Sequence, residues 1–332
     1  MGTFDNAFGA KYRSLGIRVR YEARRALNRI DNEQVRRARH LLTALRKAPP
    51  DVILFGDSVL SFVGDHDTDR RRLSAMVSDG FGSDVSVRVV DGPSFNSDIY
   101  DAYLKLLVAA PRRPLVLIPL CVRVHSICLR DHPVHGHKRA IHALRELDPS
   151  KSAWRVRGSW PKPTQSDFEA FHREHYPTLL GDLTVGDYLS SIAQAKRSGD
   201  EPERLKMLYA YLHGGLLTPN NPALESVTRM ARTIRELGCP VVVYQTPAPV
   251  ETGTRLLGPD LAERTIASLA ALNAAYRLGA GTNVNIVESG AAFSESEFID
   301  PSDATEHLNE QGRHRLAEMI LTAAKQSPGF DQ

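Results

Sequence analysis

Short apolar runs that alternate with longer amphipathic segments restrict the fold of this chain more than any other feature. The runs are VILF, VSVRVV, PLVLIPL, PVVVYQT and VNIVES, and helical spacing of apolar residues marks the segments between and after them. Alternation of this kind predicts parallel strands with helices on both faces of the sheet. We therefore predict an α/β fold built on a five-stranded parallel sheet.

Two regions lie outside the alternation. Residues 1–48 form a predicted basic N-terminal helical arm, whose second amphipathic helix covers residues 33–47 and packs on the main body. Residues 49–325 form the predicted main domain, interrupted at about residues 124–221. This interruption is rich in His, Trp, Tyr and Pro, carries helical patterns and lacks a strong strand signal. We expect a helical insertion over the carboxyl edge of the sheet, where it would shape a pocket.

Charge and hydropathy exclude several classes of protein. The first 50 residues hold 12 Lys or Arg against 4 Asp or Glu, which is typical of a solvated helical face or of a weak contact with an anionic membrane. Aromatic interleaving and known binding motifs are missing, so we expect no nucleic-acid partner. No apolar run approaches the roughly 18 residues that span a bilayer, and residues 1–30 show no signal-peptide core. We predict a cytoplasmic protein.

The chemistry is suggested by two distant segments. DVILFGDSVLSF, residues 51–62, places Ser58 at the carboxyl end of the first predicted strand, and DPSDATEHLNEQG, residues 300–312, places His307 at the start of the last helix. Strand ends of a parallel sheet meet at one edge, which is where such sheets bind their ligands. Nucleophilic acyl transfer needs a serine, a histidine that takes its proton and a group that orients the histidine.

FGDSVL followed about 250 residues later by DATEHLN resembles the SGNH, or GDSL-type, hydrolase superfamily. The resemblance covers roughly residues 50–125 and 223–325. It implies a flavodoxin-like three-layer α/β/α fold, with Ser58 as nucleophile and first oxyanion donor through its backbone N–H. It also implies that Gly92 supplies a second oxyanion N–H and that His307 is the general base.

The sequence departs from the family pattern at two places. Cys121 stands where the family has an oxyanion Asn, and a thiol is a weak donor. Arg123, two residues on, offers a stronger charged donor, and we predict this role for it. The acid that orients His307 normally lies three residues earlier, at Ala304 here. We favour Asp303, then Glu306, then a dyad without an acid.

Two polar residues after the fourth apolar run, Gln245 and Thr246, are candidates for substrate contact because they follow a strand end. The histidines match no metal-ligand spacing, so we expect no metal and no cofactor. The resemblance implies a serine-dependent esterase or deacylase acting on a small-molecule acyl ester. The first alternative is an O-acyltransferase that moves an acyl group to a sugar or natural-product hydroxyl, and the second is a degenerate, non-catalytic binding protein.

Overall fold

A computed structural model describes residues 33–125, 137–145, 147, 170, 173–177, 179–181, 183–281, 284–300 and 304–328. Its centre is a five-stranded sheet in which every strand pair is parallel, in the order β2-β1-β3-β4-β5. This confirms the predicted sheet, and its strand order is that of flavodoxin-like doubly wound folds. The strands are β1 (Val52–Gly56), β2 (Val87–Asp91), β3 (Leu115–Leu120), β4 (Val241–Gln245) and β5 (Asn285–Val287).

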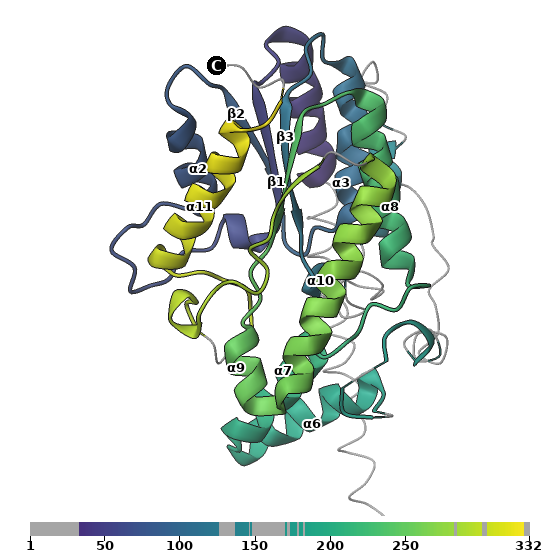
Figure 1. Cartoon of the computed structure of the whole chain (residues 1–332), viewed down its shortest axis with the longest axis vertical. Coiled ribbons are helices and arrows are strands. Elements are labelled where there is room, and N and C mark those ends of the chain that lie inside the picture. Colours follow the sequence, from purple (N-terminus) through teal and green to yellow (C-terminus); the bar gives the residue numbers. More distant parts are fainter. Residues whose placement is uncertain are drawn as a thin grey trace, which may run out of the picture.

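Helices cover both faces of this sheet and make the three layers of the fold. In Figure 1, α2 and α11 lie on one side of the strands, and α3, α8 and α10 lie on the other. The helices are α2 (Leu73–Phe81), α3 (Ser97–Leu104), α4 (Lys138–Arg145), α6 (Val185–Ser198), α7 (Glu201–His213), α8 (Pro222–Leu237), α9 (Val250–Leu257), α10 (Pro259–Ala280) and α11 (Glu310–Lys325). Short 3-10 turns are η1 (Ser58–Leu60), η2 (Lys105–Ala109), η3 (Arg123–His125) and η5 (Glu295–Glu297).

The buried strands explain why their sequences are continuous apolar runs. Successive side chains of a strand point to opposite faces, and both faces of this sheet are covered. Ile53 and Phe55 of β1 therefore belong to the core under α3, α8 and α10, whereas Val52 and Leu54 belong to the core under α2 and α11.

Residues 33–47 are helical, as predicted, and they belong to the main body. The apolar face of this helix is buried in the same core as α3 and α8, through Ala38, Leu41, Leu42 and Leu45. Two exposed arginines of this helix, Arg36 and Arg37, both contact Glu33, at 2.6 and 3.0 Å. Residues 1–32 of the predicted arm lie outside the described residues.

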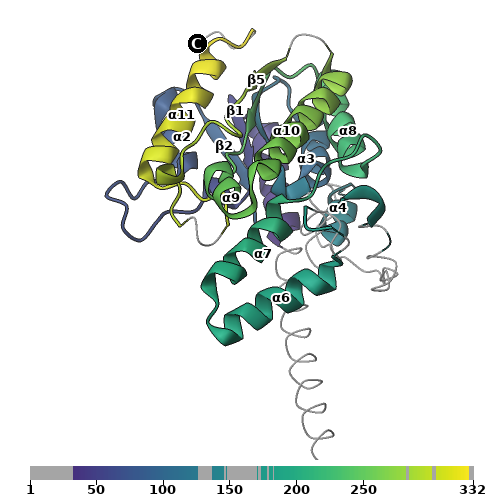
Figure 2. The ribbon, with the colours of Figure 1, turned by 60° about the horizontal axis from the view of Figure 1, so that its bottom comes forward.

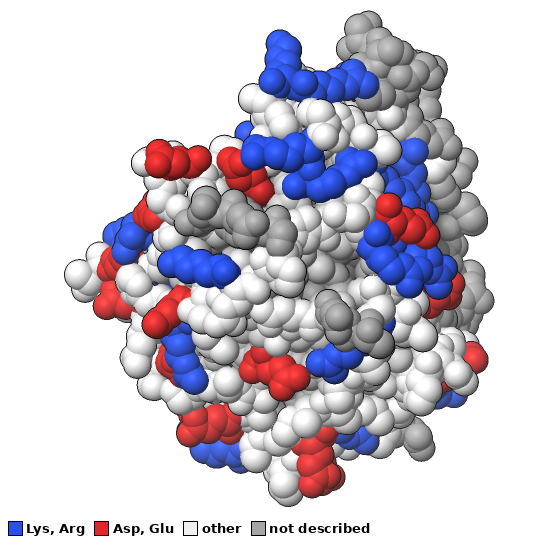
Figure 3. All heavy atoms as spheres, turned by 45° about the horizontal axis from the view of Figure 1, so that its top comes forward, with Lys and Arg blue, Asp and Glu red and all other residues white. Residues whose placement is uncertain are grey.

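Within the described part of residues 124–221 all regular structure is helical or turn. Figure 2 shows α6 and α7 as a helical pair at the end of the molecule opposite the C-terminus. In the described parts of the chain, no helix has both the length and the apolar character needed to cross a membrane. On the face shown in Figure 3, Lys and Arg side chains are interspersed with Asp and Glu.

Candidate active site

Ser58 and His307 lie within hydrogen-bonding distance of each other, although 249 positions separate them in the sequence. Ser58 opens η1 directly after β1, and His307 lies in the loop just before α11. The imidazole Nε2 is 3.1 Å from the Ser58 Oγ. This is the contact through which a histidine takes the proton of a serine nucleophile.

The two residues before Ser58, Gly56 and Asp57, determine the geometry of its turn. The Asp57 side chain is the N-cap of η1, and its Oδ1 accepts the backbone N–H of Val59 at 2.9 Å. At Gly56 a Cβ atom would lie 2.1 Å from the Leu60 Cδ1, so only glycine fits there without moving a buried leucine. Because Ser58 is the first residue of its turn, the turn leaves its N–H without an acceptor, and none is present in the part of the chain described here.

Gly92 lies beside this turn because of the register of the two strands. Gly56 at the end of β1 pairs with Asp91 at the end of β2, and Gly92 follows directly. A Cβ at Gly92 would lie 2.4 Å from the ring of Phe95, which is fully buried. The close approach of this ring explains the glycine, and the register places it next to the candidate nucleophile.

Arg123 and Glu306 form a buried ion pair at the same edge of the sheet. The Arg123 Nε donates to the Glu306 Oε2, and the Cys121 thiol lies 3.7 Å from the Glu306 Oε1. Burial raises the pKa of the Cys121 thiol well above its usual range, so the thiol stays protonated. The residues named by sequence as replacements for the family's Asn thus both contact Glu306.

Glu306 therefore binds Arg123 and Cys121 with its two carboxylate oxygens. No hydrogen bond joins a carboxylate to the imidazole of His307 among the residues that the structure describes. Asp303, the acid favoured from sequence, lies outside the described residues.

Burial shifts the pKa values of Asp57, Glu306 and His307. It raises the pKa of Asp57 to about 6, with a further contribution from the negative charge of Glu306. It also raises the pKa of Glu306, against the opposing effect of Arg123. Burial lowers the pKa of His307 to about 4, and the positive charge of Arg123 acts in the same direction. The imidazole is therefore neutral at pH 7, which is the form that accepts a proton.

The loop before His307 is tied to the insertion by a contact that sequence reasoning missed. His213, at the end of α7, contacts the backbone carbonyl of Ala304 through its Nε2 at 2.8 Å. Ala304 is fully buried and has a φ of 52°, a left-handed conformation that is unfavourable for alanine. The insertion thereby helps to hold the segment that carries the candidate base.

Phe62 is a second residue that the sequence did not single out. Its ring stacks on the imidazole of His307 with centroids 4.1 Å apart and planes 5° apart. Phe62 is 46% exposed, so its ring covers the imidazole from the solvent side. The only sequence signal was an apolar residue four positions after Ser58.

Gln245 and Thr246 have structural contacts at the end of β4. The Gln245 amide donates to the Asn273 Oδ1 at 3.1 Å and accepts the backbone N–H of Gly290 at 3.0 Å. Thr246 is buried, and its N–H donates to the carbonyl of Leu120 at 2.9 Å. These contacts hold Gln245 within the fold, and substrate contact by Gln245 and Thr246 stays a prediction.

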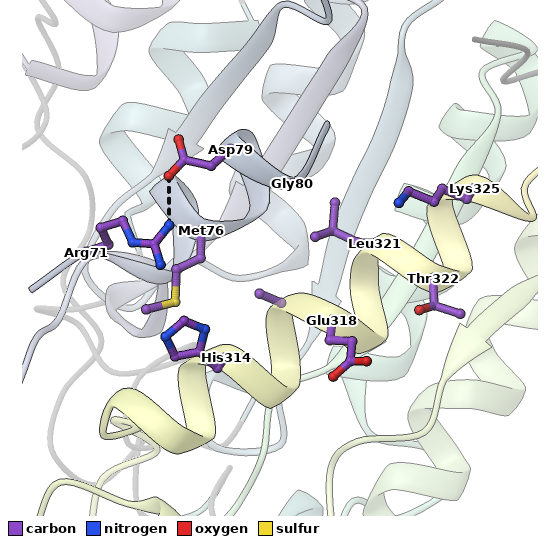
Figure 4. A pocket seen from close by; sticks show the side chains of 10 residues that line it. Arg71, Met76, Asp79, Gly80, His314, Glu318, Leu321, Thr322 and Lys325 are labelled. Atoms are coloured by element: carbon purple, nitrogen blue, oxygen red, sulfur yellow. Dashed lines mark hydrogen bonds and ion pairs between the residues drawn. The ribbon is translucent and has the colours of Figure 1, made fainter. Parts of the chain in front are cut away.

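Two hollows are lined in part by α2 or by the loop that leads to it. One of about 400 Å³ is lined by Phe62 and by residues of the loop that leads to α2. Another of about 550 Å³ lies between α2 and α11, and Figure 4 shows its lining side chains, none of which is a predicted site residue. No group of three or more His, Cys, Asp or Glu residues in the described ranges is placed to hold a metal ion.

Neither a protein-family model nor a curated protein matches the chain.

Proposed function

We propose that this protein is a serine-dependent acyl-ester hydrolase of the SGNH type, acting through an acyl-enzyme on Ser58. The observation that carries the proposal is the 3.1 Å contact between the Ser58 Oγ and the His307 Nε2 at the carboxyl edge of a parallel sheet. Two further features support it. The serine lies in a braced turn whose backbone N–H has no acceptor among the described residues, and the imidazole is neutral at pH 7.

In the proposed reaction the Ser58 Oγ attacks the ester carbonyl as His307 takes its proton. A bond forms between Oγ and the carbonyl carbon, and the bond to the alcohol oxygen then breaks. His307 returns the proton to the departing alcohol. Water, deprotonated by the same imidazole, next attacks the acyl group and releases the acid and the free serine. An alcohol in place of water would give the O-acyltransferase.

The oxyanion of the tetrahedral intermediate needs donors, and we assign this role to the backbone N–H groups of Ser58 and Gly92. Arg123 is the third proposed donor, through the guanidinium nitrogens other than the Nε that binds Glu306. Removal of one oxyanion donor typically lowers turnover about 100- to 1000-fold. Unchanged turnover in Arg123→Ala would exclude Arg123 from this role.

The proposal is tested by intact-mass spectrometry after incubation with a fluorophosphonate. We expect one adduct on the wild type, none on Ser58→Ala and much slower labelling of His307→Gln. Ser78→Ala is the matched control, because it removes a serine hydroxyl that donates to Ser74 inside α2, and it should be labelled like the wild type. A wild type without adduct would contradict the proposal and favour a non-catalytic binding protein.

Hydrolysis and transfer are then separated with short- and long-chain p-nitrophenyl esters. Nitrophenol release that is matched by free acid indicates hydrolysis. Acylated sugar, detected by mass when a sugar is added, would instead assign the protein as a transferase.

A further inference from the structure

Five residues line the hollow of about 400 Å³ next to the candidate catalytic pair. They are Ser61, the apolar Phe62 and Val63, and the basic Arg70 and Arg72. The same Phe62 ring that lines this hollow stacks on the imidazole of His307. A molecule bound in the hollow would therefore lie beside the histidine side of the reacting centre.

The side chains of Arg70 and Arg72 differ in their hydrogen bonds. Arg70 donates from one terminal nitrogen to the backbone carbonyls of Gly64 and Asp65, at 2.7 and 3.0 Å, which fixes its guanidinium over the loop. The Arg72 side chain is exposed and makes no hydrogen bond or ion pair in the structure as described. Neither arginine is bound to a carboxylate, and both keep N–H groups for a ligand.

Two of the three acids of the same loop are bound by residues that do not line the hollow. Asp67 pairs with the buried Arg313 at 2.6 Å, and Asp69 pairs with Arg71 at 2.7 Å. Asp65 contributes only its backbone carbonyl to Arg70, and its side chain does not line the hollow. The lining of the hollow therefore holds two arginines and an aromatic ring, and no acidic residue.

We propose that this hollow is a subsite for a phosphate group on the alcohol half of the ester. The inference rests on the proposed function. His307 must return a proton to the departing alcohol, so that half of the substrate lies on the histidine side, where Phe62 is. Guanidinium groups bind phosphate oxygens through charge-assisted hydrogen bonds, and the phenyl ring covers the carbon chain between phosphate and ester. The substrate class is thus an acylated phospho-alcohol.

The test compares 1-acetylglycerol with 1-acetylglycerol 3-phosphate, which differ only in the phosphate. We expect the wild type to have a kcat/KM at least tenfold higher for the phosphorylated ester. Arg72→Gln should lower that value about tenfold and leave the neutral ester within about twofold. The Arg72 side chain makes no cap hydrogen bond to α2, so this variant should fold normally.

Arg71→Gln is the matched control, with the same loss of charge one residue away. Arg71 points into the groove between α2 and α11, where it pairs with Asp79 at 3.1 Å, as Figure 4 shows. The Arg71→Gln variant should retain the preference for the phosphorylated ester, because Asp69 still has its second partner, His314, at 2.9 Å. Equal effects of the two variants would overturn the subsite, because only the overall charge would then matter.

A binding measurement separates the subsite from the reaction. Isothermal titration calorimetry of glycerol 3-phosphate with Ser58→Ala needs no turnover, and we expect binding that weakens about tenfold when Arg72→Gln is added. Binding by Ser58→Ala with no fluorophosphonate adduct on the wild type would refute the hydrolase and retain the subsite. Absence of both this binding and the substrate preference would overturn the subsite.

Discussion

The phenyl ring of Phe62 lies parallel to the imidazole of His307, with the ring centroids 4.1 Å apart. Phe62 is one of few large apolar side chains in the described structure that remain substantially exposed, and this contact accounts for its position. A flat apolar cover over an imidazole keeps water from one face of the imidazole ring. It therefore contributes to the burial that lowers the pKa of His307 to about 4.

Phe62→Ala should move the acid limb of activity to higher pH. In the wild type His307 stays neutral down to a pH of about 4, so labelling by the fluorophosphonate should fall only near that value. Exposure of the imidazole raises its pKa towards the ordinary 6.5, and labelling should then be lost at higher pH. Labelling rates between pH 3.5 and 8 measure the shift. Phe62→Leu, which keeps an apolar cover, should shift less, and an unmoved limb in Phe62→Ala would exclude the role of the ring.

The sequence allows a prediction of the parallel sheet, and of the proximity of Ser58 and His307, for a simple reason. Buried parallel strands are apolar along their whole length, and their carboxyl ends share one edge, so local patterns determine which distant loops meet. The helix at residues 33–47 was accessible in the same way, because its apolar face follows the helical period.

The hydrogen-bond and ion-pair partners of the polar side chains could not be predicted from the sequence in that way. Glu306 is adjacent to His307 in sequence, yet it binds Arg123 across the sheet edge. Gln245 follows the rule for strand ends, yet its amide is bound to Asn273. Which residue a polar side chain binds depends on the direction of the side chain and on loops that approach from other elements. Neither has a periodic signal in the sequence.

Arg123→Met should destabilise the fold by about 3–5 kcal/mol, because it leaves the buried Glu306 carboxylate without its counter-charge. The double variant Arg123→Met with Glu306→Gln should lose clearly less, since no uncompensated charge remains buried. Urea unfolding of the single and double variants forms a double-mutant cycle. Additive losses would mean that the two side chains do not form the ion pair.

Gly56→Ala should cost about 1–3 kcal/mol of unfolding free energy through overpacking, since the new methyl group would meet the Leu60 side chain. Leu60 is buried, so it has little room to move. Adding Leu60→Ala removes the clashing atoms, and the double variant should be more stable than the sum of the two single losses predicts. Urea unfolding measures all three. Strict additivity would show that the clash is relieved elsewhere.

His213→Gln should reduce the loss of stability in acid. Burial lowers the pKa of His213 to about 4 in the folded protein, whereas the unfolded chain has the ordinary value of 6.5. The unfolded state therefore binds more protons, and the stability present above pH 6.5 falls as the pH decreases towards 4. At pH 5 this amounts to about 2 kcal/mol for one histidine.

Urea unfolding of the wild type and of His213→Gln at pH 7 and pH 5 tests this loss of stability in acid. His307 adds a loss of the same sign, and Asp57, with its raised pKa, adds a change of the opposite sign. Both are present in the two proteins, so the difference between wild type and His213→Gln isolates His213. The glutamine amide can still donate to the Ala304 carbonyl, whereas His213→Ala removes that donor and should cost about 1–3 kcal/mol at pH 7 as well. The same pH dependence in wild type and His213→Gln would show that His213 is not buried in its neutral form.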